Sequence, residues 1–576
     1  MEELWRERKE GAPAASLQKK WGPLLSQFLW QRDIVEEKEV EDFINPKLSS
    51  LRSPYELKNL KESAERLGAA VTDGQKICVY GDYDIDGTCG MHLLYSFLQQ
   101  CCAKKEQVSY LQPDRFSDGY GVHPELIEKL KKQGVEVIVT VDTGITAFEG
   151  VRKAQQLGLD VIITDHHKQT GDLPATDYIV NPNQDLDKSS LSYLCGAGVA
   201  FYLAIAVRGV LKKQAYFKAV VPDIRQWLDL FVLGTISDVV DLVDQNRLLS
   251  KHGLRRLRQT ERIGLKALVA RSCDLEQELK AEDVGFRIGP RLNATSRMGR
   301  SELFSELLVC TDEDRAQKIV DEVFTLNEKR KAIQEECFKE ALVVAEAAKK
   351  QNTDLRVLVV QGPWHEGVIG IVAAKLCEKY KCPCAVLAVN KEKGTAKASM
   401  RNFASLFSSV KLLEACSDLL LKFGGHPAAA GFEIELAKIS DFNQKINQAA
   451  DDYAKTQADQ EHFCYYDGEL PKDISLLDVK NLSKAEPFGK GNSTPLFLLK
   501  NFECEWSKIK IMKELHFKAS TPEGFDLLAF SKVEALKQML NGRAKLNLDL
   551  LVVPEINVFR GRAKIQMRVE RMQESL

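Results

Sequence analysis

The stretch Lys76-Ile77-Cys78-Val79-Tyr80-Gly81-Asp82-Tyr83-Asp84-Ile85-Asp86-Gly87 joins a short apolar run to three carboxylates at alternate positions. Apolar runs of this length, bounded by turn residues, are typical of buried strands, and similar runs recur at residues 135–141, 161–164 and 178–180. Helix-length amphipathic stretches lie between them. Alternating strands and helices predict an α/β domain with a doubly wound, mostly parallel sheet, whose ligand site lies at the carboxyl ends of the strands.

Acidic side chains follow each of the first three predicted strands. They are Asp82, Asp84 and Asp86 after the first strand, Asp142 after the second, and Asp165 with His166 and His167 after the third. A single Asp in this position more often caps the next helix, and a single His is more often a satisfied core residue. Three strand ends in order favour one shared site, to which Asp238, after the apolar run 230–233, adds a further carboxylate.

The chemistry of this set indicates a metal site. A calcium loop of the EF-hand type does not fit, because position twelve counted from Asp82 is Leu93 rather than Glu. Carboxylates with one or two imidazoles suit Mn²⁺ or Mg²⁺ better than they suit thiolate-bound zinc. Two such ions about 3.5 to 4 Å apart activate a water and neutralise a phosphoryl group, so the residues predict phosphoester hydrolysis.

The composition of the chain indicates its class of protein but does not identify its binding partner. The chain has 576 residues, with 80 basic and 82 acidic side chains, so any polyanion must be held by a local basic surface. Fourteen scattered cysteines fit a reducing compartment and read as buried small apolar residues. With no signal-peptide pattern at the start and no run of 18 apolar residues, we expect a cytoplasmic protein that does not use a membrane.

The pattern changes several times along the chain and predicts five parts. We expect an N-terminal helical segment that packs on the catalytic domain, the α/β catalytic domain, a connecting helix almost free of Gly and Pro, a second α/β domain, and a small C-terminal β-barrel. In the same order, their predicted boundaries are 1–70, 71–300, 301–350, 351–455 and 456–576.

The acidic and histidine motifs are similar to those of a known family. Gly81 to Gly87, Asp142-Thr143-Gly144, Asp165-His166-His167 and Ser237-Asp238 resemble the four ordered motifs of the DHH phosphoesterase family. The segments 118–121, 195–200 and 290–294 resemble one branch of that family, the bacterial single-strand-specific 5′ to 3′ DNA exonucleases. This resemblance spans nearly the whole chain.

The resemblance implies a role for each motif residue. Two Mn²⁺ or Mg²⁺ ions are expected to be held by Asp84, Asp86, Asp142, His166 and Asp238, with Asp142 bridging them and Asp82 as a further ligand or hydrogen-bond acceptor. His167 is expected to contact the scissile phosphate, and Asp165 to orient its neighbours through hydrogen bonds. The catalytic set is therefore Asp84, Asp86, Asp142, His166, His167 and Asp238.

Residues 362–370 and 423–431 resemble the DHH-associated substrate-binding domain. Both are Gly-rich, and glycine lets backbone amides approach a phosphate while a neighbouring His adds a donor. The family's phosphate-binding segment is altered here to Lys397-Ala398-Ser399-Met400-Arg401-Asn402, in which the Ser and the Arg are retained. The expected substrate contacts are His365, Ser399, Arg401, Gly424, Gly425 and His426, with Arg115, Arg291 and Arg297 as candidates that surface ion pairs could equally explain.

The C-terminal part resembles the OB-fold of the same exonuclease branch, at residues 486–492 and 557–562. A charge run is usually a solvated face, but basic residues beside an aromatic ring also suit a groove for single strands. The expected DNA contacts are Phe559, Arg560, Arg562 and Lys564.

The resemblance implies a 5′ to 3′ exonuclease that hydrolyses single-stranded DNA to 5′-mononucleotides in recombination and repair. A single-strand-binding protein and a helicase are the partners that it implies. Two alternatives are a DHH-family phosphodiesterase of short oligonucleotides or cyclic dinucleotides and a DNA-binding relative without catalysis. A phosphodiesterase of short substrates would not need the third domain. A relative without catalysis would be expected to lack some of the acidic and histidine motif positions, and all of them are present here.

Overall fold

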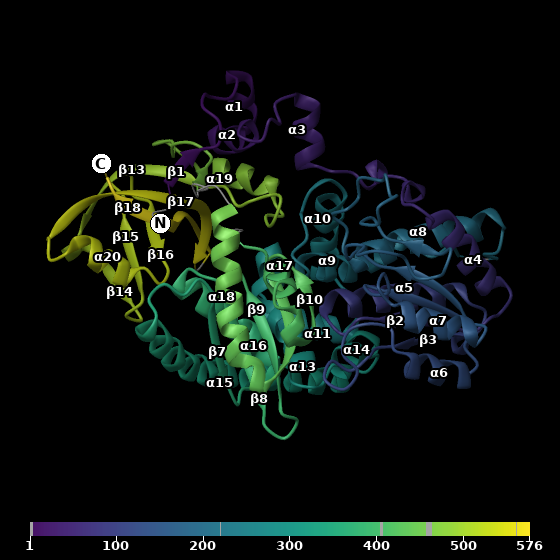
Figure 1. The fold of residues 1–576 in the computed structure, drawn as a ribbon. Coiled ribbons are helices and arrows are strands. Elements are labelled where there is room, and N and C mark those ends of the chain that lie inside the picture. The colour runs from purple at the N-terminus through teal and green to yellow at the C-terminus, as the bar shows by residue number, and fades with distance from the viewer. Residues whose placement is uncertain (1–3, 219, 404–406, 457–462, 560, 576) are drawn as a thin grey trace.

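The computed structural model describes residues 4–218, 220–403, 407–456, 463–559 and 561–575 (Figure 1). Its first domain is built on a five-stranded sheet with strand order β3-β2-β4-β5-β6, and all four strand pairs are parallel. The strands are β2 (Ile77–Gly81), β3 (Val108–Leu111), β4 (Val137–Val141), β5 (Asp160–Thr164) and β6 (Ile179–Val180). The sequence-based prediction of a parallel α/β sheet is confirmed.

Helices cover both faces of this sheet because the alternating side chains of each strand are apolar on both sides. Ile77 and Val79 of β2 face one core, whereas Cys78 and Tyr80 face the other. The first core is covered by α4 (Leu60–Thr72), α5 (Ile85–Cys101) and α8 (Gly196–Lys213), and the second by α6 (Pro124–Lys132) and α7 (Phe148–Gln156). The sheet is therefore doubly wound.

A helical part follows the first sheet and extends the first core. Its helices are α9 (Leu228–Ser237), α10 (Asp244–Arg258), α11 (Ile263–Ser272), α12 (Ala281–Asp283), the π-helical turn η5 (Val284–Ile288), α13 (Gly289–Arg297) and α14 (Glu302–Val309). The connecting helix predicted over 301–350 is interrupted after α14. The long helix α15 (Glu313–Gln351) starts where the side chain of Asp312 accepts a hydrogen bond from Arg315 N at 2.6 Å, which satisfies a free amide of the first turn.

The second domain has a mixed five-stranded sheet of order β10-β11-β9-β8-β7. Its strands are β7 (Leu358–Gly362), β8 (Cys384–Asn390), β9 (Thr395–Arg401), β10 (Leu420–His426) and β11 (Ala429–Glu435), and only the β7–β8 pair is parallel. Helix α16 (Glu366–Tyr380) packs between this sheet and α15, while α17 (Ser409–Glu414) and α18 (Ile439–Thr456) cover the other face.

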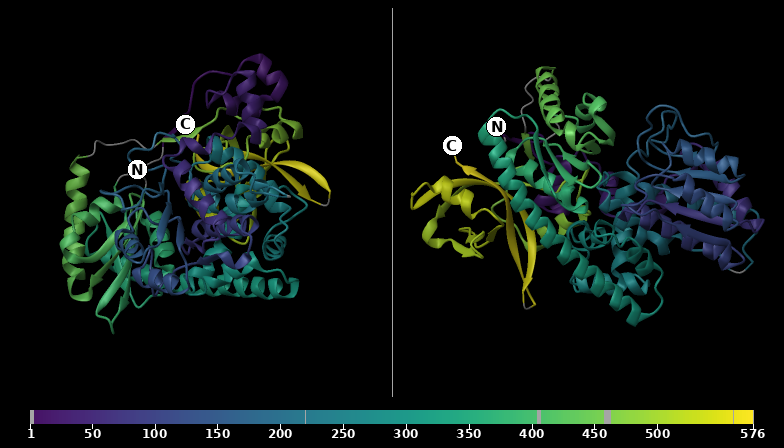
Figure 2. Two further views of the ribbon diagram at one scale, coloured as in Figure 1. Left: turned by 90° about the vertical axis from the view of Figure 1, so that its right-hand side faces the viewer. Right: turned by 60° about the horizontal axis from the view of Figure 1, so that its bottom comes forward.

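The C-terminal domain is a six-stranded sheet of order β13-β17-β18-β16-β15-β14. The strands are β13 (Phe497–Glu505), β14 (Lys510–Met512), β15 (His516–Ser520), β16 (Asp526–Ala529), β17 (Lys545–Phe559) and β18 (Arg562–Glu574), with α19 (Leu476–Leu482) and α20 (Val533–Leu540) packed beside them. In the part of the chain that the structure describes, the edge strands β13 and β14 are not paired with each other. The predicted small C-terminal β domain is confirmed, although its described strands leave the sheet open between these two edges, and Figure 2 shows its long β17–β18 hairpin in yellow.

The N-terminal segment follows in part the prediction that residues 1–70 pack on the catalytic domain. The turn η2 (Pro54–Glu56) and α4 lie against α8, and side chains of α10 donate to the carbonyl oxygens of Phe43, Ile44 and Pro46. The helices α1 (Ala15–Trp21), α2 (Pro23–Trp30) and α3 (Glu37–Ile44) share a core with the C-terminal domain. Strand β1 (Leu4–Glu7) also pairs with β12 (Phe463–Tyr466). Leu24, Leu25 and Phe28 are fully buried there because the C-terminal sheet needs a second layer over its apolar face. Among the described residues, no helix is both long and apolar enough to cross a membrane.

Candidate active site

The carboxyl ends of β2, β4 and β5 meet at one edge of the first sheet because these strands are parallel neighbours. Asp142 follows β4 directly, in left-handed backbone with φ 62°, a conformation that Asp tolerates better than most residues. Asp238 has a different origin from the other acids: the apolar run before it forms the helix α9, and Asp238 is the residue that ends this helix. The side chains of the site therefore come from the end of one helix and the ends of three strands.

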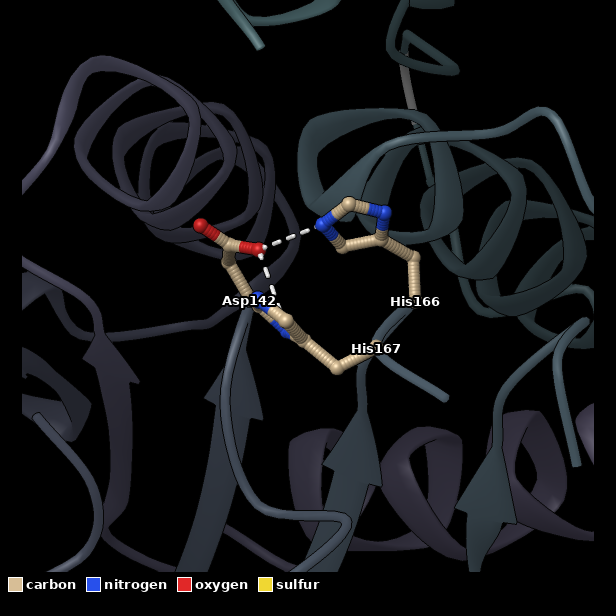
Figure 3. A group of neighbouring side chains, drawn as sticks. All are labelled: Asp142, His166 and His167. Atoms are coloured by element: carbon tan, nitrogen blue, oxygen red, sulfur yellow. Dashed lines mark ion pairs between the residues drawn. The ribbon is translucent and has the colours of Figure 1, made fainter. Parts of the chain in front are cut away.

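Three groups of side chains are close enough to share a metal ion. They are Asp142 with His166 and His167, Asp86 with His166 and Asp238, and Asp82 with Asp84 and Asp142. The Nε2 atom of His166 lies 3.1 Å from Asp142 Oδ1 (Figure 3). The same atom lies 3.6 Å from Asp238 Oδ2 and 4.0 Å from Asp86 Oδ2. Since Asp142 and His166 each belong to two groups, the arrangement suits two neighbouring ions.

The shifted pKa values of the side chains in this group favour the binding of a cation. Burial raises the pKa of Asp142 well above its usual value, and the nearby carboxylates of Asp86 and Asp84 raise it further. The same two causes, burial first, raise the pKa of Asp86 to about 6 and that of Asp238 to about 8. Burial lowers the pKa of His166 to about 3, which keeps its imidazole neutral and able to ligate a metal.

Two buried carboxylate oxygens of this group fit the chemistry of a divalent cation. Among the described residues, Oδ1 of Asp82 and Oδ1 of Asp142 are buried and accept no hydrogen bond. Buried polar atoms in native proteins almost always have a partner. Hard divalent cations prefer carboxylate oxygen, so the residues present fit Mn²⁺ or Mg²⁺.

The start of α8 holds Asp86 in place. Gly196 N and Ala197 N donate hydrogen bonds to the two carboxylate oxygens of Asp86, at 2.6 and 2.9 Å. A Cβ atom on Gly196 would lie only 2.8 Å from both Cα and Cγ of Asp142, so glycine is required for the helix to approach. Similarly, a Cβ atom on Gly234 would lie 2.5 Å from Asp86 Oδ1. The backbone of α8 and α9 therefore lies directly against the carboxylates of Asp86 and Asp142 at these two glycines.

Asp84 combines the two roles that its sequence position allows. Its side chain accepts a hydrogen bond from Gly87 N at 2.9 Å and so caps α5, which is what a single Asp after a strand commonly does. It also belongs to one of the three possible metal-binding groups. A cap and a ligand are compatible, because a carboxylate has more than one lone pair to offer.

Asp165 and His167 form a separate, strongly hydrogen-bonded unit. Asp165 is fully buried and accepts hydrogen bonds from Ile145 N at 2.9 Å and His166 N at 2.7 Å, while its Oδ1 lies 2.8 Å from His167 Nδ1. Burial alone would raise the pKa of Asp165, but the bond to His167 lowers it to about 2. Burial alone would lower the pKa of His167, but the same bond and charge raise it to about 9.

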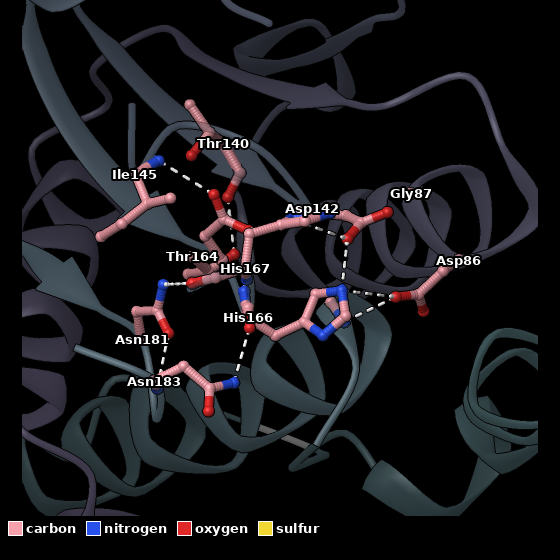
Figure 4. Close-up of polar contacts among 12 residues, drawn as sticks. Asp86, Gly87, Thr140, Asp142, Ile145, Thr164, His166, His167, Asn181 and Asn183 are labelled. Atoms are coloured by element: carbon pink, nitrogen blue, oxygen red, sulfur yellow. Dashed lines mark hydrogen bonds and ion pairs between the residues drawn. The ribbon is translucent and has the colours of Figure 1, made fainter. Parts of the chain in front are cut away.

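Two asparagines fix the backbone of the histidine pair. Asn181 Nδ2 donates to the carbonyl oxygen of His167 at 2.9 Å, and Asn183 Nδ2 donates to that of His166 at 2.6 Å (Figure 4). Sequence reasoning assigned these asparagines no role. Their only signal in the sequence was their place one and three residues after a predicted strand.

A cavity of about 340 Å³ opens over the acidic group. Besides the carboxylates and His167, its walls include Tyr83, Arg115, Tyr120, Asn293 and Arg297. Tyr120 was not predicted as a site residue, although its segment had been noted; its hydroxyl lies 3.1 Å from His167 Nδ1 and 3.3 Å from the carbonyl oxygen of Asp142. Tyr83 and Asn293 were missed in the same way, because neither residue type marks a site by itself.

Two histidines of the second domain contact the first domain, and one of them contacts the cavity residue His167. His426, at the end of β10, stacks on His167 with ring centroids 5.8 Å apart, and His365 meets Phe116 of the first domain at 6.0 Å. Arg297 Nη1 donates to Gly367 O at 3.1 Å, and the close packing at Gly367 leaves no room for a side chain. The predicted contacts His365 and His426 therefore lie at the boundary between the two domains.

Three arginines gather beside the cavity without acidic partners. Arg115, Arg297 and Arg401 make no ion pair within the described ranges, and the three charges lie close enough to affect one another. Burial, followed by the charges of Arg115 and Arg401, lowers the pKa of Arg297 to about 9. Arg401 Nη1 donates to Ser399 Oγ at 2.9 Å. Unpaired guanidinium groups that repel one another form a ready site for an anion such as phosphate.

The remaining predicted contacts lie away from this cavity. The guanidinium of Arg291 sits 4.5 Å from the ring centre of Phe324 on α15, so it does not line the cavity. Gly424 and Gly425 are in β10, and Gly425 has φ 141°. Arg562 and Lys564 are exposed at the start of β18, whereas Arg560 and the side chain of Phe559 fall outside the described part of the chain.

Comparison with family models divides the chain into three matched regions. Residues 76–235 match the DHH family, N-terminal domain, residues 352–452 match the DHHA1 domain, and residues 466–571 match the RecJ OB domain. The first match contains all of the acidic and histidine site residues except Asp238, which lies three residues beyond it.

Whole-chain comparisons agree with these regions. The chain is 34% identical to the single-stranded-DNA-specific exonuclease RecJ of Bacillus subtilis, over 95% of this chain and 67% of that protein. It is 33% identical to the exonuclease of the same name from Escherichia coli, over 98% of both chains. The chain is also similar to the crystal structure of RecJ in complex with Mn²⁺ from Thermus thermophilus, with a TM-score of 0.81 and 28% sequence identity. The alignment covers 100% of this chain and 80% of that chain. The resemblance inferred from the motifs is confirmed.

Proposed function

The chain belongs to the RecJ family of single-stranded-DNA-specific exonucleases, and from this premise we propose that it removes nucleotides from the 5′ end of single-stranded DNA with Mn²⁺ or Mg²⁺. The observation that carries the proposal is the pairing of two features in one cavity. Carboxylates with unpartnered buried oxygens lie at its base, and arginines without acidic partners lie at its side. The first feature suits metal ions, and the second suits a phosphate.

The ions would be held by the acids at the strand ends and by His166. We propose Asp84, Asp86, Asp142, His166 and Asp238 as ligands, with Asp142 shared and Asp82 in contact through its free oxygen. When bound, two such ions supply an activated water and neutralise charge on the phosphoryl group. Gly196 N and Ala197 N keep the Asp86 carboxylate oriented for this task.

His167 is proposed to hold the scissile phosphate rather than a metal ion. Its Nδ1 is engaged by Asp165 at 2.8 Å, so Nε2 remains to face the substrate. Because its pKa is raised to about 9, the ring is an imidazolium at neutral pH and donates a charged hydrogen bond. Asp165 has no direct part in the chemistry and acts through His167.

The three arginines are proposed to set the 5′ to 3′ direction of cleavage. The 5′-terminal phosphate, which is not the phosphate that is cleaved, would be bound by Arg401 with Ser399 and by the nearby Arg115 and Arg297. A 5′-phosphate held there places the first internucleotide bond over the metal ligands, and cleavage releases a 5′-mononucleotide. His365 and His426 would supply further donors from the second domain.

The C-terminal domain is proposed to bind the strand beyond the cavity. The exposed Arg562 and Lys564 on the β17–β18 hairpin offer charge to the backbone of a single strand. Such a domain is not needed for a dinucleotide, so it favours a long substrate. We further propose a cytoplasmic role in recombination and repair, with a helicase that supplies single strands and a single-strand-binding protein that covers them as partners.

The test uses a 5′-phosphorylated, 3′-labelled single strand with Mn²⁺ or Mg²⁺. Its duplex, the same strand with a blocked 5′ end and a cyclic dinucleotide are run beside it. Metal-dependent shortening of the free single strand from its 5′ end, abolished by EDTA and by Asp142→Asn, is the expected result. Cleavage of the dinucleotide alone would instead identify a small-substrate phosphodiesterase, and a bound but intact strand would contradict catalysis.

A further inference from the structure

One helical run beside the cavity connects the second domain to the C-terminal domain. It consists of α12, η5 and α13, which follow one another without a break from residue 281 to residue 297. Just before the run, Lys280 Nζ lies 3.0 Å from Glu486 Oε1 of the C-terminal domain. At its end, Arg297 Nη1 donates to Gly367 O of the second domain. Because the 5′-phosphate contacts are proposed at the Arg297 end, a strand that extends to the C-terminal domain runs along these helices toward Lys280.

An exposed phenylalanine lies on this run between the cavity and the C-terminal domain. Asn293 and Arg297 line the cavity from one face of α13, one helical turn apart. Phe286 precedes them by about two and three turns, so the helical period places it near the same face. At about 1.5 Å per residue it lies roughly 10 Å from Asn293 along the helix, and its side chain is 78% exposed. An aromatic ring uncovered to this extent offers a stacking surface for a base.

A second exposed apolar side chain directly follows Asp238. Val239 is 63% exposed and has φ 57°, which is rare for a β-branched residue. Residues held in sparsely populated backbone conformations are concentrated at functional sites. The helical run is close by, because η5 packs against α9 and a Cβ atom on Gly289 would lie 3.5 Å from Ser237 Oγ. The end of α9 and the helical run therefore meet beside Asp238, where Val239 is uncovered.

A tight turn of the C-terminal domain packs on the segment that follows α9. The turn spans residues 489–492, with Lys490 and Gly491 at its corner. Leu242 N donates a hydrogen bond to Lys490 O at 2.7 Å. Gly491 has φ 76°, and a Cβ atom on it would lie 2.8 Å from Val243 Cγ1, so this close approach requires glycine. These contacts fix one corner of the C-terminal domain beside the proposed metal ligands.

Lys490 brings a cation to this corner. Its Nζ lies 3.3 Å from Asp241 Oδ1, and its side chain is 61% exposed. Burial and the charges of Asp86 and Asp84 raise the pKa of Asp238, and the charge of Lys490 counters this rise, so the ammonium group is near the cavity. An ammonium group has three donors, and the contact with Asp241 leaves donors for a phosphate.

We propose that Phe286, Val239 and Lys490 bind the first nucleotides on the 3′ side of the scissile phosphate. A base stacks on Phe286 and packs on Val239 at its edge, while Lys490 contacts a phosphate between these nucleotides. This subsite makes a turn of the C-terminal domain part of the substrate cleft. It does not select a sequence, because every base offers a face for stacking. The inference deepens the proposed function and rests on it, since the 5′-phosphate contacts set the direction of the strand.

Local changes in the DNA test the subsite by equilibrium binding in EDTA, without cleavage. Fluorescence anisotropy compares an intact 5′-phosphorylated single strand with the same strand carrying abasic residues at its second and third positions. We expect Phe286→Ala to raise the Kd about 5- to 100-fold for the intact strand and to leave the Kd for the abasic strand unchanged. Phe286→Trp keeps the ring and should bind both strands as the wild type does.

A neutral backbone tests the lysine in the same way. Lys490→Gln should weaken binding of the intact strand about 2- to 10-fold, but it should not weaken binding of a strand whose second and third internucleotide linkages are uncharged methylphosphonates. Equal losses on the charged and the uncharged strand would remove Lys490 from the subsite.

Two variants and one further strand are the controls. Tyr55→Ala removes an aromatic side chain that is 50% exposed on η2, and Lys480→Gln removes an exposed lysine of α19; both should bind every strand as the wild type does. Abasic residues near the 3′ end should leave the effect of Phe286→Ala in full. An equal effect of Phe286→Ala on the intact strand and on the strand with abasic residues at the second and third positions would overturn the subsite.

Binding and cleavage separate this inference from the proposed function. If the wild type shows the expected dependence on strand position but cleaves no strand with any metal, the subsite stands and the proposed exonuclease fails. If the wild type cleaves the strand from its 5′ end but its binding does not depend on the second and third positions, the exonuclease stands and the subsite is refuted.

Discussion

Replacing Gly196 by alanine tests whether the backbone of α8 sets the positions of the metal-binding carboxylates. A methyl group at this position would lie 2.8 Å from Cα and Cγ of Asp142. Because carbon atoms in contact are about 3.5 to 4.0 Å apart and the Cβ of Asp142 would lie nearer still than these two atoms, Asp142 or α8 must move by more than about 1 Å. The hydrogen bond from Gly196 N to Asp86 survives the substitution, so the change is steric.

The size of the effect follows from the precision that a metal site needs. Ligand distances are tolerated within about 0.2 Å, and a misplacement of about 1 Å costs up to roughly 100-fold in rate. A factor of 100 corresponds to about 2.7 kcal/mol of transition-state stabilisation. We expect Gly196→Ala to lose this order of kcat and to bind Mn²⁺ about 10- to 100-fold more weakly, as substitutions beside metal ligands do.

The assays are single-strand cleavage at saturating metal and a Mn²⁺ titration followed by electron paramagnetic resonance. Gly209→Ala is the matched control, since Gly209 is exposed near the end of the same helix and its Cβ would meet only Tyr55 Oη, at 3.4 Å. This control should keep full activity. If Gly196→Ala cleaves DNA and binds Mn²⁺ as the wild type does, α8 does not position Asp142 and the steric reasoning is refuted.

Four further outcomes are expected. The pKa values of Asp86 and Asp238 are raised to about 6 and 8, so protons compete with metal and Mn²⁺ affinity should rise steeply from pH 6 to pH 8; equal affinity at both, by the same titration, would contradict the site. In Asp165→Asn, the imidazolium of His167 loses its carboxylate, and the alkaline limb of the pH profile of kcat/KM should move from near 9 toward about 6.5; an unmoved limb would remove His167 from the mechanism. Arg401→Gln should raise KM about 10- to 100-fold for a 5′-phosphorylated strand but not for one with a 5′-hydroxyl, whereas Lys393→Gln, in the exposed β8–β9 turn, should change neither. Arg247→Met removes the donors to the carbonyl oxygens of Phe43 and Glu486, whereas the carbonyl oxygen of Ala485 keeps its hydrogen bond from Asn492 Nδ2. Calorimetry should then show a free energy of unfolding of the C-terminal domain that is lower by about 1 to 3 kcal/mol per carbonyl left without a partner, and an unchanged trace would show that this junction does not hold the domain.

The site could be predicted from sequence to the extent that parallel strands align their ends. Asp82, Asp142 and His166 follow neighbouring parallel strands, and the pairing of those strands brings them together without further information. Asp238 was correctly brought to the same site, although it ends a helix. A fully buried helix such as α9 is apolar on all sides and cannot be distinguished by periodicity from a buried strand.

Other features depended on partners that the sequence does not specify. The apolar faces of α1 to α3 predicted burial, but nothing in them indicated the C-terminal sheet rather than the first domain as the surface that covers them. Arg115, Arg297 and Arg291 were equivalent in the sequence. Only the packing of α13 shows that Arg297 faces the cavity while Arg291 lies over Phe324.

A small β-barrel was predicted from short strands and turn residues, which indicate a β-sheet domain but not whether its edge strands pair. Closure depends on whether the edge strands β13 and β14 meet, and this is a property of strand tilt and register. The resemblance to an OB-fold was informative about domain type and location, and the family match at residues 466–571 agrees with it.

Anomalous diffraction from crystals soaked in Mn²⁺ would test the central claim most directly, namely that this edge of the first sheet holds two catalytic ions. We expect two peaks about 3.5 to 4 Å apart, with Asp142 in contact with both and His166 in contact with one. In crystals of Asp142→Asn, at least one of the two peaks should be lost. Peaks elsewhere in the molecule, or a single ion that Asp142 does not touch, would contradict the two-metal site.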